Sequence, residues 1–343
     1  MIHRNPAPEK PPPGQLLLQI EGASNLDPAH LLDVWARQRH RFAAVLRGFG
    51  PEDWAAPTRC ADWCAHDVVR HLCDGTAIAA GTDHRALDLT AGFDPRITPR
   101  GWPAVSAGQS PAATLGRFMA TTDDLFALLR GRLAQGLRFD VCLPYGPMDW
   151  TILALHAFWD SWLHERDVLL PRGREHPADD DATFYATAYG LFIAAAVATM
   201  FGGRVQEKLT LGGTGGGIFD LDSRGAVTLI VTRVTTAGPP AAEITDALAG
   251  RPPAAAVLGD LPANSRPALS HMANFFNTPV QPSTTLGGGS DISGTAPRLI
   301  TQTRQARTRT ATRIEEPLPA PRHDVGKPPE GNPALTTRRE RAG

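Results

Sequence analysis

Three polar residues recur at intervals of four in the segment 150–169, namely His156, Asp160 and His164. In a helix, residues at this spacing stack along one face, with Cβ atoms about 5–6 Å apart. Apolar residues of the same segment form an adjoining stripe: Ile152, Leu155, Trp159 and Trp162. A carboxylate and an imidazole one turn apart can bind one metal ion, but the same spacing also arises from ordinary hydrogen bonds on a helix surface. The pattern indicates a divalent metal site at Asp160 and His164, with a plain polar face as the alternative.

A third metal ligand must come from another element, and His71 is the best candidate. It lies in the helical segment 65–89, with Asp67 one turn before it and Leu72 on the apolar side. Two imidazoles and a carboxylate suit Zn²⁺ and leave one position open for water or substrate, as in catalytic zinc sites. Zn²⁺ is the expected metal, although these ligand types also accept Ni²⁺ and Fe²⁺. Binding of His156 as a further ligand would close the open position; the alternative is that it supports the site without touching the ion.

Two other groups of residues have the types that do chemistry but not the spacing. Cys60, Cys64 and Cys73 match no common zinc pattern, so we interpret them as core or loop cysteines. The Gly-rich segment 212–217 lacks the Lys-Ser/Thr pair of a phosphate-binding loop and does not open a helix. We interpret it as a hairpin turn.

The elements that must position the candidate ligands are helices. Apolar residues recur at helical spacing in five segments, at about residues 27–48, 65–89, 111–134, 150–169 and 183–201. Gly- and Pro-containing breaks separate them, including the break at 144–147, and helices joined in this way favour an antiparallel bundle. Three strand-like segments and two short helices follow, near 208–211, 218–221, 227–234, 243–249 and 267–276. The predicted fold class is an antiparallel helical bundle followed by a small α+β domain.

Composition divides the chain into four parts: a flexible leader (1–25), the helical bundle (26–202), the α+β domain (203–280) and a disordered basic tail (281–343). The tail has almost no apolar residues, so it cannot bury enough surface to offset the entropy of ordering. It contains ten Lys or Arg against six Asp or Glu. A solvated tail is the simpler interpretation, and an arm that binds nucleic acid or a protein partner is the alternative.

The overall charge and the cysteines limit the classes of function. The formal net charge of −1 gives no reason to expect binding to nucleic acid or to an anionic membrane. Four cysteines in 343 residues do not form a disulfide framework. The N-terminus lacks the apolar region of a signal peptide, and the longest apolar helical stretch, 191–201, is too short to cross a bilayer. We expect a soluble, cytoplasmic protein that does not contact membranes.

Four motifs carry a family resemblance: Trp54-x-x-Pro57-Thr58-x-Cys60-x-x-Trp63, Asp67-Val-Val-x-His71-Leu72, Pro144-Tyr-Gly-Pro147 and Asp160-x-x-x-His164-x-x-Asp167. Over about residues 27–280 the chain resembles the mycothiol-dependent maleylpyruvate isomerase family. The resemblance implies a DinB-like four-helix bundle followed by a small sterol-carrier-like α+β domain. It also implies that His71, Asp160 and His164 hold the metal. The family carboxylate is usually Glu, and because Asp160 is one methylene shorter, the ion must sit closer to this helix or bind more weakly.

The resemblance also implies a reaction and its partners. These are mycothiol as a low-molecular-weight thiol cosubstrate and a small unsaturated acid as substrate. A metal with an open position lowers the pKa of a bound thiol, so that the thiolate can add to an activated double bond, allow rotation and be eliminated. Arg251 matches an L-x-G-R element of the family's smaller domain and could bind a carboxylate in a catalytic role. A surface position near a helix end is the alternative for Arg251, and we interpret Arg166 and Asp167 as surface charges.

Two other functions stay open at this point. The protein could be a regulatory or partner-binding module whose metal is structural or lost, or a metal-dependent hydrolase with water as the nucleophile. One fold hosts many reactions, so the bundle alone does not choose among them. An open coordination position separates the enzymes from the regulatory module, and dependence of turnover on a thiol separates the isomerase or thiol transferase from the hydrolase.

Overall fold

The computed structural model describes residues 16–21, 27–79, 106–136, 140–143, 146–200, 202–224 and 227–277. All of these belong to one compact unit of the chain, Met1–Ile292, and the second unit, Ser293–Gly343, lies outside the described residues. The predicted tail, the rest of the predicted leader, the end of the predicted helix at 80–89, and Pro144 and Tyr145 of the family motif also lie outside them.

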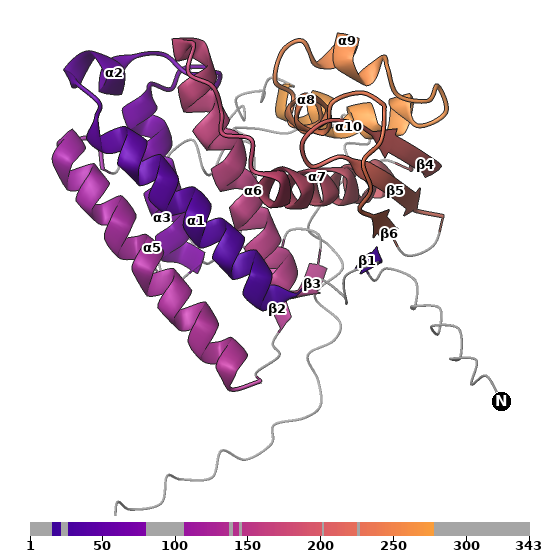
Figure 1. The fold of residues 1–343 in the computed structure, drawn as a ribbon, viewed down its shortest axis with the longest axis horizontal. Coiled ribbons are helices and arrows are strands. Elements are labelled where there is room, and N and C mark those ends of the chain that lie inside the picture. The colour runs from indigo at the N-terminus through magenta and orange to yellow at the C-terminus, as the bar shows by residue number, and fades with distance from the viewer. Residues whose placement is uncertain are drawn as a thin grey trace, which may run out of the picture. The chain divides into compact units, whose positions relative to one another are not determined.

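The helical bundle contains the long helices α1 (Pro28–Arg47), α3 (Ala65–Ala79), α5 (Pro111–Ala134) and α6 (Trp150–Leu169), seen side by side in Figure 1. Helix α5 packs on α1 and α3, and α6 packs on α1 and α3 from another side. A short helix, α2 (Pro51–Ala55), precedes α3, and a 3₁₀ turn, Leu170–Arg172, follows α6. The bundle therefore brings α3 against α6, the two helices that carry the candidate ligands.

Local sequence sets where the helices begin. The Asp27 carboxylate accepts a hydrogen bond from the backbone N–H of Ala29 at 2.9 Å, and Pro28 occupies the first turn. The Ser110 hydroxyl accepts from the N–H of Ala113 at 3.2 Å before α5. Such caps satisfy backbone donors that have no partner inside the helix. The sequence prediction of these two starts is confirmed.

Helix α7 (Asp180–Met200) joins the bundle to the second part of the structure, since it contacts α6, α8 and α10. Among the described residues it is the one helix long and apolar enough to cross a membrane, over 180–199, a longer window than the apolar stretch 191–201 of the sequence. Because 94% of that window is buried inside the protein, the helix has the burial of a core element. Its alanine-rich surface packs in the main hydrophobic core with residues of both parts.

A four-stranded sheet has the order β1-β6-β5-β4. Strands β4 (Gln206–Leu211), β5 (Gly217–Asp222) and β6 (Val227–Thr232) are antiparallel neighbours, and the Gly-rich segment makes the predicted turn between β4 and β5. Buried residues alternate along β5 and β6, as in a sheet with one face on the core. Helices α8 (Ala241–Leu248), α9 (Ala254–Leu258) and α10 (Arg266–Asn277) follow, and Figure 1 labels all three. The predicted fold class, a helical bundle followed by a small α+β region, is confirmed.

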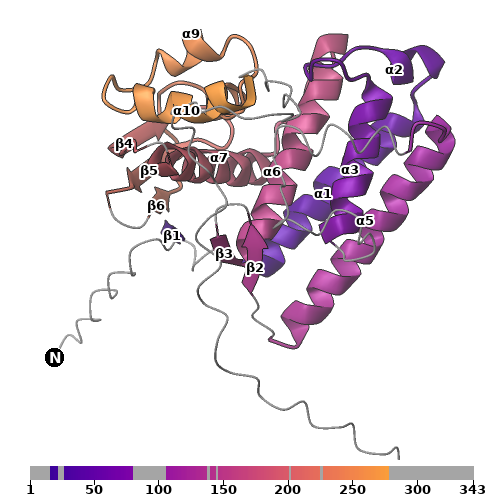
Figure 2. The same ribbon diagram turned by 180° about the vertical axis from the view of Figure 1, so that it is seen from behind.

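Two strand pairs were not predicted. Strand β1 (Leu16–Glu21), which the sequence places in a flexible leader, pairs in parallel with β6. Its pairing partner lies about two hundred positions away in sequence, so no local pattern announces it. Strands β2 (Asp140–Leu143) and β3 (Gly146–Asp149) form a hairpin where only a break was expected, and this hairpin contacts α6 (Figure 2). The hairpin precedes the first residue of α6 and so fixes where the ligand-bearing helix begins.

Candidate metal centre

The three predicted ligands come together between α3 and α6. The Asp160 carboxylate lies between two imidazoles: Oδ2 is 3.3 Å from His71 Nε2, and Oδ1 is 3.3 Å from His164 Nε2. One ligand atom from each residue lies within 4.8 Å of the other two. The spacing of four on α6 therefore places Asp160 and His164 on one face, and the packing of α3 on α6 brings His71 to them.

The two imidazoles are enclosed, whereas the carboxylate is not. The side chains of His71 and His164 are each 8% exposed, and that of Asp160 is 32% exposed. The half-buried Trp63 lies against both imidazoles, with ring centroids 5.0 Å from His71 and 6.1 Å from His164. The accessible side of the group is thus the side of Asp160, where a further molecule can approach.

The electrostatics of the group favour a cation at its centre. Burial opposes ionisation of Asp160, but the charges of His164 and His71 outweigh it and hold the pKa of this carboxyl well below its usual range. Burial likewise opposes protonation of His164, but attraction by Asp160 raises the pKa of this imidazole well above its usual value. At neutral pH Asp160 is therefore ionised and His164 carries a proton that a metal ion would replace.

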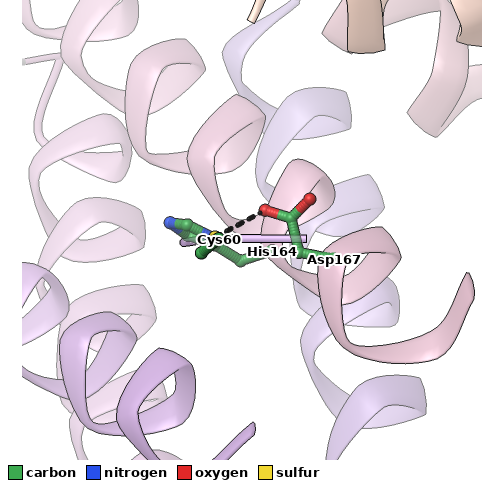
Figure 3. A group of neighbouring side chains, drawn as sticks. All are labelled: Cys60, His164 and Asp167. Carbon is green, nitrogen blue, oxygen red and sulfur yellow. Dashed lines mark hydrogen bonds and ion pairs between the residues drawn. The ribbon is translucent and has the colours of Figure 1, made fainter. Parts of the chain in front are cut away.

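His164 uses its other ring nitrogen on a second acidic residue. Its Nδ1 lies 3.0 Å from Asp167 Oδ2, and Cys60 Sγ lies 3.1 Å from the same oxygen and 3.5 Å from Nδ1. Figure 3 shows these three side chains close together. Cys60, His164 and Asp167 therefore form a second group of potential ligands that shares His164 with the first. The sequence missed both Cys60 and Asp167 as members of the site.

The arginines around Asp167 indicate which of the two groups of potential ligands suits a metal ion. Arg59 Nε donates to Asp167 Oδ1 at 2.9 Å, and Arg251 donates to both carboxylate oxygens, at 3.0 and 2.6 Å. Two guanidinium groups on one carboxylate repel a metal ion and satisfy the oxygens that it would use. Asp167 is thus suited to orient His164, because a carboxylate on the second nitrogen of an imidazole fixes the ring and raises its basicity.

The interpretation of Arg166 and Asp167 as surface charges is wrong. Asp167 has no exposed surface, and Arg166 Nη2 donates to Asp246 of α8 at 2.6 Å. Arg59 also binds Asp246, through two bonds of 2.9 and 2.8 Å. The physical reason is that residues of the second part of the chain cover the end of α6, which the pattern of α6 alone does not reveal.

Arg251 follows α8 and approaches the site through Asp167. Besides its two bonds to that carboxylate, it donates from Nη1 to the backbone oxygen of Ala249 at 2.8 Å, and Nη2 lies 3.7 Å from Cys60 Sγ. Burial opposes its charge, but Asp167 outweighs this effect and raises the pKa of the guanidinium. The side chain is only 17% exposed, so the alternative of a surface arginine is wrong. Its contact with the metal ligands runs through Asp167.

His156 lies on the same helix but has another partner. Its Nδ1 is 2.9 Å from the Tyr189 hydroxyl of α7, and it belongs to neither group of potential ligands found among the described residues. Burial lowers the pKa of His156, so the imidazole is neutral at pH 7. The hydrogen bond to Tyr189 accounts for a polar residue at this depth.

The remaining described cysteines lie away from the ligand groups. Cys64 Sγ donates to Asp67 Oδ2 at 3.0 Å at the start of α3. Cys73 is buried, and its Sγ donates to the backbone oxygen of Thr114 at 3.7 Å. Neither belongs to a group of potential metal ligands within the part of the chain that the structure describes. Cys60 also lies in a loop, before α3, but unlike these two it belongs to a group of potential ligands.

Comparison with known proteins points to one family. Residues 21–169 match the family described as the mycothiol maleylpyruvate isomerase N-terminal domain. Among solved structures, that of a mutant of mycothiol-dependent maleylpyruvate isomerase aligns with a TM-score of 0.46 and 13% identity, over 66% of this chain and 90% of that chain. A search of curated proteins gave no match. The matched residues contain both groups of potential ligands and end before Arg251.

Proposed function

Residues 21–169 of the chain belong to the mycothiol maleylpyruvate isomerase N-terminal domain family, and on this premise we propose a function for the whole protein. It is a metal-dependent and mycothiol-dependent isomerase or thiol transferase of the maleylpyruvate isomerase type, and it acts on a small unsaturated acid. The observation that carries the proposal is the convergence of His71, Asp160 and His164 from two helices, with ligand atoms within 4.8 Å of one another.

The residues present fit a divalent metal. Two imidazole nitrogens and one carboxylate are the ligand set of many catalytic zinc sites, which keep one position for a further molecule. Asp167 supports this assignment because it holds His164 by Nδ1 and leaves Nε2 toward Asp160. When bound, the metal, proposed to be Zn²⁺, would lower the pKa of a thiol and so supply a nucleophile at neutral pH.

Arg251 is proposed to contact the substrate. Asp167 fixes its guanidinium with two hydrogen bonds, and the remaining N–H groups can donate to a carboxylate or carbonyl oxygen. A fixed cation of this kind stabilises negative charge that develops on a substrate oxygen without reorganising. Asp167 would then position two groups at once, the metal ligand His164 and the substrate-binding Arg251.

The proposed partners are a small acid and a low-molecular-weight thiol. The protein is proposed to act in the cytoplasm. Cys60, Cys64 and Cys73 are all free thiols, which suits a reducing compartment. Free thiols alone do not identify mycothiol, so the cosubstrate rests on the family.

Turnover of maleylpyruvate by the zinc-loaded protein, with and without mycothiol, tests the proposed function. We expect isomerisation that requires the thiol. Hydrolysis of an acid substrate without thiol would favour the hydrolase instead. If the protein binds stoichiometric metal but shows no thiol-dependent turnover, the proposed isomerase activity is refuted and a regulatory metal protein is favoured.

A further inference from the structure

A buried arginine of α1 bonds to α3, the helix that carries His71, and has no anion of its own. Arg39, on α1, is 2% exposed, and its Nη2 donates to the Thr76 hydroxyl of α3 at 2.7 Å. Its Nε and Nη1 are buried and have no hydrogen-bond partner. Its guanidinium lies over the ring of Phe118, 4.6 Å from the centroid. The aromatic ring and the hydroxyl hold the group in place, while two donor atoms stay unused.

Arg39 is charged despite its burial. Burial lowers its pKa to about 10, with attraction by Cys73, Asp160 and Glu165 acting in the opposite direction, so it is a cation at neutral pH. Burying an ion without a paired, hydrogen-bonded partner is unfavourable. Such an unpaired cation is therefore expected to have a compensating ligand.

The neighbouring carboxylates already have partners. Glu165 accepts hydrogen bonds from Gln38 and from Arg41, and it also lies 3.1 Å from His176. Asp160 lies between the two imidazoles and would be used by the metal. A divalent ion together with Arg39 outweighs the single charge of Asp160, so the occupied centre would attract an anion.

We propose that Arg39, held by Thr76, forms a buried subsite beside Asp160 that binds a carboxylate group of the substrate. This inference rests on the proposed function, because it assigns part of the acid substrate to the same site. The shape of the guanidinium favours a carboxylate, which accepts hydrogen bonds from N–H donors in one plane. Thr76 takes one nitrogen, and its own hydroxyl donates to the Leu72 oxygen at 2.6 Å, so the orientation of Arg39 is fixed.

The test is binding of maleate, a small unsaturated acid, to the zinc-loaded protein without mycothiol, measured by isothermal titration calorimetry. Arg39→Met should weaken maleate binding about 10- to 100-fold, the effect of losing a charge-assisted hydrogen bond from a buried site. The maleate affinity of Arg39→Lys should lie between those of Arg39→Met and wild type. Maleamide, the neutral diamide, should bind Arg39→Met and wild type equally. Arg130→Met is the matched control, since Arg130 is an exposed arginine on α5, and its maleate affinity should equal that of wild type.

Zinc content and thermal melting of each variant show whether the site and the fold persist. An Arg39→Met protein that is folded, carries zinc and binds maleate as tightly as wild type would overturn the subsite, as would a wild type that binds maleate no better than maleamide. If Arg39→Met does not fold, Thr76→Val takes its place: weaker maleate binding with full zinc supports the subsite, and unchanged binding overturns it. Arg39-dependent binding without thiol-dependent turnover would refute the proposed function and leave the subsite standing.

Discussion

His164 Nδ1 and Asp167 Oδ2 lie 3.0 Å apart on the same helix, one turn from each other. Because Asp167 is fully buried and also binds Arg251, one carboxylate joins the proposed metal centre to the segment after α8. The ring of His164 is thereby fixed with Nε2 toward Asp160. This relationship connects the two parts of the chain in a single hydrogen-bonded unit.

Removing a proposed ligand should remove the metal. We expect one equivalent of zinc in wild type purified without chelators, and almost none in His71→Ala or His164→Ala, because two ligands hold an ion poorly. His156→Ala is the matched control on the same helix. Since His156 bonds to Tyr189, this variant should keep its zinc. Elemental analysis measures all four proteins, and a wild type without metal would refute the centre.

Asp167→Asn should weaken the metal site without removing a ligand. An amide keeps the shape but loses the charge that orients His164 and raises its basicity, and such changes lower metal affinity by about 10- to 100-fold. Competition with a chromophoric zinc chelator measures the affinity. Asp33→Asn serves as the control, since Asp33 is an exposed carboxylate paired with Arg130. Equal zinc affinities for Asp167→Asn and wild type would contradict the orienting role.

Arg251→Lys separates the substrate contact from metal binding. Lysine keeps the charge but cannot make two parallel bonds to Asp167, so its head is no longer fixed. We expect kcat/KM for the thiol-dependent reaction to fall about 10- to 100-fold, as for loss of a charge-assisted hydrogen bond. Zinc content should stay the same. Full activity in this variant would rule out the role proposed for Arg251.

Glu165 should make the stability of the bundle sensitive to acid. Burial acts to raise the pKa of this carboxyl, but hydrogen bonds and charge from His176 and Arg41 outweigh burial and lower it. A depressed pKa in the folded state stabilises the fold above the unfolded value, about 4.3, and this stabilisation is lost as the pH falls through the folded value.

Glu165→Gln should therefore lower the free energy of unfolding by about 1.5–3 kcal/mol at pH 7, because Arg41 and His176 lose charge-assisted hydrogen bonds to a buried carboxylate, while Arg41 keeps Asp179. The difference from wild type should shrink as the pH falls below about 4. Urea unfolding at a series of pH values measures it. Glu52→Gln, at an exposed glutamate, should match wild type throughout. A difference that does not depend on pH would show that the charge is not the cause.

The sequence predicts the site residues that lie on one helix, but not the contacts that other parts of the chain make with them. Asp160 and His164 follow from spacing along one helix, and the starts of α1 and α5 near residues 27 and 111 follow from local sequence. His71 needed a family motif, because spacing does not tell which helix packs on α6. Asp167 was misassigned since its partners, Arg59 and Arg251, come from segments far away in sequence. Buried polar contacts between distant elements depend on tertiary packing, which no periodicity encodes.

Strand β1 has a consequence for dividing the protein. It precedes the bundle yet completes the sheet that follows the bundle, by pairing with β6. A fragment that starts at α1, or one that starts at the proposed boundary near residue 203, lacks β1. In both fragments β6 becomes an edge strand whose backbone N–H and C=O groups have no neighbouring strand on one side. Open edges recruit strands from other molecules. Shortened forms of this protein are therefore expected to self-associate through β6, unless residues 16–21 are supplied as a separate peptide.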